Sequence, residues 1–176
     1  CLTSYYSDLW SDEFKLVFTA DSWSKYDARL SNTHFKNLKN EWTWNTPLRT
    51  DYSRRQALIE IDVLSAMSLG LDLNQLKSIY RFNFYVLRSY DTNTFYDAKG
   101  RIVFTNNGSL KNVGFSRKEF EEIKDKKSGV FTRTIIDETL NDTPVERVIE
   151  YHAPFDKCDR EKDYETAWSY FSKLRS

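Results

Sequence analysis

Residues 51–71 (DYSRRQALIEIDVLSAMSLGL) constrain the fold of this 176-residue chain more than any other segment does. They are rich in good helix formers, and Gly70 is placed as a C-terminal stop. Two sets of side chains recur at helical spacing on different faces: Ala57, Leu58, Ile61, Leu64 and Ser68, and Ile59, Val63, Ala66 and Met67. Because a helix with two apolar faces has to be covered on both, we expect this helix to lie at the centre of the fold.

Two acids interrupt this apolar segment. Glu60 and Asp62 are the only acids of the predicted helix beyond its first turn. A buried carboxylate needs a partner, and Arg54, Arg55 or a nearby amide could provide one. A structural ion pair is therefore the first interpretation of these acids, and a catalytic carboxylate is the alternative.

A second helix is predicted over residues 73–90 (LNQLKSIYRFNFYVLRSY). Asp72 and Gln75 have the spacing of a capping box at its start. The connection to the first helix is short, so the two helices form a hairpin or a sharp corner.

This second helix carries a cationic stripe. At 100° per residue, Lys77, Arg81 and Arg88 fall within about 40° of one another, and Phe84 lies beside them. Guanidinium groups bind phosphate oxygens in a fork, and an aromatic ring can cover a sugar or a base. The stripe is thus a candidate DNA contact, and pairing with acids elsewhere in the chain is the alternative.

The net charge of zero, from 26 Lys and Arg and 26 Asp and Glu, conceals one basic block. Residues 73–118 hold eight basic residues against two acids. The basic residues are Lys77, Arg81, Arg88, Lys99, Arg101, Lys111, Arg117 and Lys118. Such a block can present a basic face to a polyanion, and a chance fluctuation on a solvated surface is the alternative.

Strand patterns begin after residue 91. Residues 94–97 and 101–105 predict a β-hairpin whose tip, 98–100, is basic. Residues 130–136 and 145–151 alternate in polarity and predict an antiparallel pair around the 137–144 connection.

Two further helices complete the prediction. The first is a short helix from residue 117 to about residue 127. Ser116 and Glu119 predict a capping box at its start, and Phe115 and Phe120 predict a hydrophobic staple. The apolar face of a C-terminal helix over 159–175 is formed by Tyr164, Ala167, Trp168, Phe171 and Leu174. The predicted fold is a single α+β domain over 1–176, with a helical hairpin core over 51–90, antiparallel β-hairpins over 91–152 and a C-terminal amphipathic helix.

The first fifty residues contain four of the five tryptophans: Trp10, Trp23, Trp42 and Trp44. Their large apolar area predicts a segment that wraps onto the rest of the domain or onto a missing neighbour. A platform on which bases stack is the alternative.

Few residues have the pattern of a catalytic site. The chain has no Gly-rich phosphate loop, paired-cysteine metal site, HExxH or GxSxG. Its two histidines are His34 and His152, and the latter is expected to be structural at a strand end. Glu122-Ile123-Lys124 matches the E-x-K of metal-dependent nucleases, with Asp137 or Asp156 as a further ligand, but falls in a predicted helix where those enzymes use a strand.

The two cysteines, Cys1 and Cys158, have neither metal-ligand spacing nor a disulfide framework. Cys158 is interpreted as a small packed residue, with an activated thiol as the alternative. No apolar stretch approaches the roughly 20 residues of a membrane span, and the start does not resemble a signal peptide. We therefore expect a cytoplasmic location and no membrane partner.

Several strings of the chain resemble the C-terminal region of large bacterial adenine-specific DNA methyltransferases, the fused restriction–modification type of phage-defence loci. They are TPLRTDYSRRQALIEIDVLSAMSLGL at 46–71, IYRFNFYVLRSYD at 79–91, YDAKGRIVFTNNG at 96–108 and PVERVIEYHAPFDKCDREKDYETAW at 144–168. The resemblance extends over most of the chain, including its CLTSYYSDLW start. It implies that the chain is the C-terminal domain of such an enzyme.

In that family an Asn-Pro-Pro-Tyr-type motif and a Gly-rich S-adenosylmethionine loop carry out methyl transfer. This sequence contains neither, so the resemblance implies a part without catalytic residues, metal or cofactor, and S-adenosylmethionine belongs to the parent protein. The partners it implies are double-stranded DNA and the methyltransferase core of the same parent chain.

Three hypotheses of function follow. In the first, the eight basic residues of 73–118 contact DNA phosphates and assist DNA binding or target recognition. In the second, the tryptophan-rich segment docks the domain onto the methyltransferase core or a partner subunit. In the third, the E-x-K at 122–124 belongs to a small metal-dependent nuclease.

Overall fold

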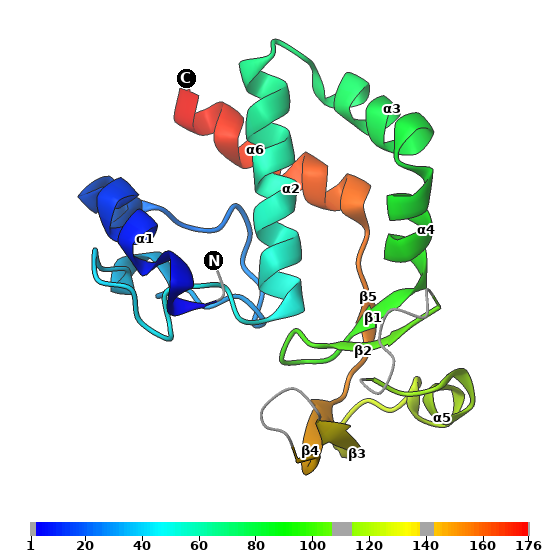
Figure 1. The fold of residues 1–176 in the computed structure, drawn as a ribbon. Coiled ribbons are helices and arrows are strands. Elements are labelled where there is room, and N and C mark those ends of the chain that lie inside the picture. The colour runs from blue at the N-terminus through cyan, green and yellow to red at the C-terminus, as the bar shows by residue number, and fades with distance from the viewer. Residues whose placement is uncertain (1–2, 107–113, 138–142, 176) are drawn as a thin grey trace.

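The computed structural model describes residues 3–106, 114–137 and 143–175, and it has the predicted α+β fold with a C-terminal helix. Helix α2 (Asp51–Ser68) runs through the middle of the molecule, and α6 (Arg160–Arg175) crosses it (Figure 1). Helix α1 (Ser7–Glu13) lies on one side of α2, and α3 (Leu73–Asn83) and α4 (Tyr85–Asn93) lie on the other (Figure 1). The short strands gather at the end where α2 begins (Figure 1).

Helix α2 begins and ends as its sequence predicts. The Thr50 side chain accepts a hydrogen bond from the Ser53 amide at 3.2 Å, which caps the first turn. At the other end Gly70 has φ +73°, and the Leu71 amide donates to the Ala66 carbonyl at 2.9 Å. This left-handed residue stops the helix.

The expectation that α2 is covered on two faces is only half right. Ile59, Val63 and Ala66 form a core with Leu76 and Tyr80 of α3 and Tyr164 and Ala167 of α6. On the other face Leu58 is 57% exposed and Ile61 is 56% exposed. The physical reason is that α3 and α6 pack against only one side of α2, so the second apolar face stays in contact with solvent.

The predicted continuous helix over 73–90 is wrong, because the chain breaks at Phe84. Helix α3 spans Leu73–Asn83 and α4 spans Tyr85–Asn93, while Phe84 adopts φ −110° and ψ 47°. The residues around the break are aromatic, β-branched or Asn, which have low helix propensity. The turn directs α4 toward the strands (Figure 1) and lets Asp91 meet Arg160 of α6.

The hairpins are confirmed, and one strand was not predicted. Strands β1 (Thr94–Tyr96) and β2 (Ile102–Thr105) pair antiparallel, and the short β5 (Asp156–Lys157) pairs antiparallel with the free edge of β1. Strands β3 (Val130–Asp137) and β4 (Val145–His152) form a separate antiparallel pair, with Val130 opposite His152.

Helix α5 (Arg117–Ile123) has the predicted capping box but ends about one turn earlier than expected. Phe120 of this helix stacks on Phe104 of β2 at a centroid distance of 4.7 Å. These rings belong to a second core, which also contains Val103, Tyr151 and Phe155 and against which Phe115 packs.

The first fifty residues contain α1 (Ser7–Glu13) and three short 3-10 helices, η1 (Ser4–Tyr6), η2 (Leu16–Ala20) and η3 (Phe35–Asn37). Their anchor is the stretch 22–30, because Leu30 packs with Tyr52, Tyr96 and Ile102 in a third core. The rest of this segment makes contacts within itself: the Trp10 indole of α1 donates to the Lys39 carbonyl at 2.8 Å. Among the tryptophans of this segment, Trp44 is exposed and the other three are half-buried.

Candidate nucleic-acid interface

Two of the three cations of the predicted stripe are paired with acids of α6. Lys77 forms an ion pair with Glu165. Arg81 forms a two-pronged ion pair with Glu161, in which Nε donates at 2.7 Å. The hydrogen bond from Arg81 lowers the pKa of Glu161 below its ordinary value. For these two residues the structure favours the alternative interpretation, pairing with acids elsewhere in the chain.

Arg88 stays beside Arg81 and near enough to Glu161 to help lower the pKa of that carboxyl, but helical periodicity does not place it there. The break at Phe84 places it on a different helix, so the 100° spacing that linked it to Arg81 no longer applies. Its Nη1 donates to the Arg81 carbonyl at 3.1 Å, and its side chain is exposed. The three cations therefore do not form one free basic face.

The tip of the β1–β2 hairpin is a rigid basic turn. Asp97 is fully buried, and its Oδ1 accepts from the backbone amides of Lys99 at 3.0 Å and Arg101 at 2.8 Å. Its Oδ2 accepts from the His152 amide at 3.0 Å. One carboxylate satisfies three backbone donors and so stabilises this conformation of the turn, and the two basic side chains on it are exposed.

The tip is also fixed to α2. Gly100 adopts φ +83°, and its carbonyl accepts from the Tyr52 amide at 2.9 Å. A Cβ at Gly100 would lie 3.0 Å from the Cβ of Tyr52, so only glycine allows this close approach. The turn is predicted from the sequence, but its attachment to α2 is not.

A second pair of cations, Arg117 and Lys118, begins α5. The Ser116 side chain accepts from the Glu119 amide, and the Glu119 carboxylate accepts from the Ser116 amide at 2.7 Å. These hydrogen bonds lower the pKa of Glu119. Arg117 donates to the Asn106 side chain, which places this pair at the end of β2 opposite the hairpin tip.

The two pairs are separated by the length of β2. Asn106 lies five positions after Arg101, which corresponds to about 16 Å at the rise of an extended strand. Lys111, the eighth predicted contact, lies outside the described residues.

The candidate catalytic residues are not arranged as a site. Glu122 and Lys124 lie in α5 and at its end, and Lys124 pairs with Glu121 at 2.5 Å. Burial raises the pKa of the Cys158 thiol, and this outweighs the opposite effect of Arg55 and Arg29. Over 3–106, 114–137 and 143–175, no three His, Cys, Asp or Glu residues come together as metal ligands.

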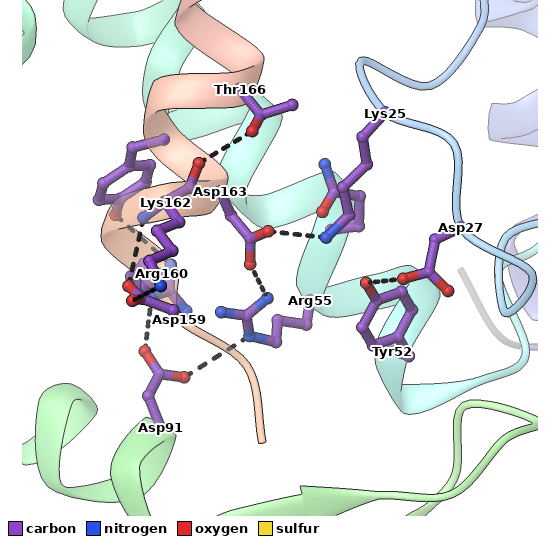
Figure 2. A network of polar contacts seen from close by, with 12 residues as sticks. Lys25, Asp27, Tyr52, Arg55, Asp91, Asp159, Arg160, Lys162, Asp163 and Thr166 are labelled. Carbon is purple, nitrogen blue, oxygen red and sulfur yellow. Dashed lines mark hydrogen bonds and ion pairs between the residues drawn. The ribbon is translucent and has the colours of Figure 1, made fainter. Parts of the chain in front are cut away.

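A buried network of charges joins the helices (Figure 2), and no motif in the sequence predicts its pairings. Arg55 of α2 donates to Asp163 at 2.6 Å, and Lys25 donates to the other oxygen of the same carboxylate at 2.7 Å. Arg160 donates to Asp91 at 2.7 Å. The network thus ties the first fifty residues, α2, α4 and α6 together.

Both acids of α2 have polar partners, but only Glu60 has one of the expected kind, an amide, because Arg55 pairs with Asp163 and Arg54 with Asp51. Asp62 accepts from Arg160 at 3.2 Å and from the Tyr164 hydroxyl at 2.7 Å. Glu60 accepts from the Gln56 amide and from the Ser24 amide, both at 2.9 Å. These contacts favour a structural role for both acids over a catalytic one.

Comparison with protein-family models, with curated proteins and with solved structures finds no match to this chain. Within the described part of the chain, none of the helices combines the length and the apolar character that a membrane crossing requires.

Proposed function

We propose that this chain is a non-catalytic domain of a DNA adenine methyltransferase of the restriction–modification type, and that it helps the enzyme bind double-stranded DNA in the bacterial cytoplasm. The four segments that resemble the C-terminal region of such enzymes support the assignment of the parent protein to this class. S-adenosylmethionine then belongs to the methyltransferase core. The role in DNA binding is supported by the arrangement of cations in the structure.

The observation that carries this role is a difference between two sets of cations. Lys77 and Arg81 of α3 are neutralised by acids of α6. In contrast, none of Lys99, Arg101, Arg117 and Lys118 pairs with a carboxylate of the described residues, and all four are exposed. A cation without an acidic partner binds phosphate at lower cost, because no existing ion pair has to break.

The hairpin supports DNA binding through its rigidity as well. The Asp97 carboxylate orders the backbone of Lys99 and Arg101 before any ligand arrives, which lowers the conformational entropy lost on binding. The pair on α5 lies about 16 Å further along β2, a distance on the scale of the major groove, which is about 12 Å wide. Contacts to phosphates on both sides of one groove would fix the orientation of the domain without reading the sequence.

A fluorescence-anisotropy titration of the chain with a labelled duplex tests the proposal. We expect binding at low salt that weakens as salt increases. The variant Lys99→Glu/Arg101→Glu should lose at least about tenfold in affinity, because two phosphate contacts become repulsive. A folded chain that does not bind duplex at low salt, or a variant that binds as tightly as the wild type, contradicts the proposal.

A docking scaffold for the methyltransferase core is the second candidate, and the uncovered face of α2 favours it. Leu58, Ile61 and Leu64 are exposed although they belong to the central helix. An apolar helix face of this kind is typical of a surface that another protein covers.

The methyltransferase core, expressed separately, tests the second candidate. The wild-type chain should bind the core, and Leu58→Ser/Ile61→Ser should weaken this binding at least about tenfold, because interface energy concentrates in a few apolar residues. Tyr26→Ser, which removes an exposed aromatic ring outside α2, is the control and should bind normally. If Tyr26→Ser has the same effect as the α2 variant, the α2 face is not the docking surface.

A further inference from the structure

A polar cavity of about 640 Å³ lies between the loops of residues 23–53. Its lining includes three cations, Arg29, Lys39 and Arg49, and none of the described residues around it is an aspartate or glutamate. The volume is within the range of about 300–1,000 Å³ that is usual for small-molecule sites. Asp27 neutralises part of this charge by pairing with Arg29, but a lining with cations and without acids still favours an anion over a cation.

Two of the three cations are held in place by other contacts. Arg29 donates to Asp27 through Nε at 2.9 Å and Nη2 at 2.8 Å, which leaves Nη1 for another acceptor. Arg49 donates through Nε to the Trp44 carbonyl at 2.9 Å and stacks on the Trp44 ring at 3.7 Å. Side chains that are already ordered lose little entropy when a ligand binds.

The third cation is free. The backbone carbonyl of Lys39 is fixed by the Trp10 indole at 2.8 Å, but its ammonium group forms no ion pair with the described residues. Two neutral side chains of the lining, Asn37 and Asn45, also make no hydrogen bond with the described part of the chain through their amides. The cavity therefore offers charge for an anionic group and amides for a polar one.

The neighbouring cavity has the opposite character. It measures about 750 Å³, its lining is largely aromatic and aliphatic, and it has two acids, Glu13 and Asp21, against one arginine, Arg54. The two cavities share His34, Pro47 and Leu48, so a ligand that enters this region meets both. An anion is attracted to the cationic cavity and repelled by the acids of the other.

We propose that the cationic cavity binds a phosphorylated ligand of nucleotide size. The phosphate would contact Lys39, Arg29 and Arg49, and the amides of Asn37 and Asn45 would bind polar atoms of the remainder. A free nucleotide or the 5′-phosphorylated end of a nucleic-acid strand can supply this chemistry. The site is separate from the hairpin contacts to DNA and does not depend on them.

Isothermal titration calorimetry of the chain in a buffer with EDTA tests this inference. The probes are ATP, inorganic phosphate and a single-stranded oligonucleotide with and without a 5′-phosphate. Lys39→Glu places an acid in the cavity and should weaken binding at least about tenfold. Lys36→Glu is the control, because it makes the same change of charge at an exposed residue that does not line the cavity. Asn45→Asp is a second variant inside the cavity.

The inference is supported if ATP binds, if Lys39→Glu and Asn45→Asp weaken this binding, and if Lys36→Glu changes it by less than about twofold. The ligand is then a free nucleotide. The same pattern with the 5′-phosphorylated oligonucleotide alone assigns a strand end. Absence of binding for all probes at about 5 mM overturns it. Equal losses in Lys39→Glu and Lys36→Glu also overturn it. Lys99→Glu/Arg101→Glu should bind these probes normally, which separates this site from the DNA-binding hairpin.

Discussion

Arg160 and Asp91, 69 residues apart in sequence, form a buried ion pair with a hydrogen bond of 2.7 Å between Nε and Oδ2. Asp91 also accepts from the Tyr80 hydroxyl at 3.1 Å, and Arg55 approaches its other oxygen at 3.8 Å. The carboxylate therefore connects α2, α3 and α6 to the end of α4. This contact depends on the turn at Phe84, because an unbroken helix would carry Asp91 in another direction.

Asp91→Asn should destabilise the fold strongly. It leaves the buried charge of Arg160 without its closest counter-ion, and breaking a buried pair in this way costs about 3 kcal/mol or more. Urea unfolding followed by circular dichroism measures the loss. Glu121→Gln, which removes one partner of a surface pair, is the control and should not change the unfolding midpoint. Equal stability of Asp91→Asn and the wild type would show that the network does not hold the helices together.

Asp27 should make stability depend on pH in the acid range. Burial raises the pKa of its carboxyl, but hydrogen bonds from Arg29 and Tyr52 outweigh this, and the pKa lies well below the ordinary 3.8. A carboxyl whose pKa is lower in the folded state stabilises the fold above the unfolded pKa and loses this effect as the pH falls below about 4.

The comparison of wild type with Asp27→Asn measures this contribution. The difference in unfolding free energy between the two should be constant from about pH 7 to 5 and should shrink as the pH falls toward about 2. Asp12→Asn, at an exposed residue of α1, should show no such difference. A difference for Asp27→Asn that is the same at all pH values would contradict the assignment.

Gly100→Ala should destabilise the hairpin tip by about 2 kcal/mol or more, because a left-handed backbone conformation and a steric clash act together. Gly70→Ala is a matched control with φ +73° and no atom within 4 Å of the added Cβ. Gly70→Ala should lower the free energy of unfolding by only about 1 kcal/mol, because it adds the strained backbone conformation without a clash. Equal losses in the two variants would mean that the contact with Tyr52 is unimportant.

Removal of the acids that neutralise α3 should increase DNA binding. Glu161→Gln/Glu165→Gln frees Arg81 and Lys77, and we expect a gain of about threefold or more in duplex affinity at low salt. Asp8→Asn/Asp12→Asn makes the same change of net charge on α1. A gain of equal size in this control would show that net charge alone, and not the position of the cations, determines the affinity.

Local signals in the sequence were sufficient for much of the fold. The capping boxes at Asp72 and Ser116 depend on residues three positions apart, and both are present. The alternation of polar and apolar residues over 130–136 and 145–151 is also a local pattern, and it predicted the antiparallel pair. Such features need no knowledge of distant residues.

Contacts over long distances in sequence account for what was missed. The periodicity of 73–90 does not contain the information that Asp91 pairs with Arg160, so it predicted an unbroken helix. It likewise could not show that Glu161, 80 residues from Arg81, neutralises part of the cationic stripe. The exposed face of α2 was missed because apolar spacing indicates what can be buried and not whether a neighbour covers it.

The salt dependence of duplex binding shows whether the hairpin tip or α3 contacts the DNA phosphates. We would measure log K against log salt concentration for the wild type, Lys99→Ala/Arg101→Ala and Lys77→Ala/Arg81→Ala. The hairpin variant should reduce the slope by roughly 1.8, since each lost phosphate contact removes roughly 0.9. The α3 variant should leave the slope unchanged, because its cations are already paired. A reduced slope for the α3 variant and an unchanged slope for the hairpin variant would contradict the proposal that the hairpin contacts DNA.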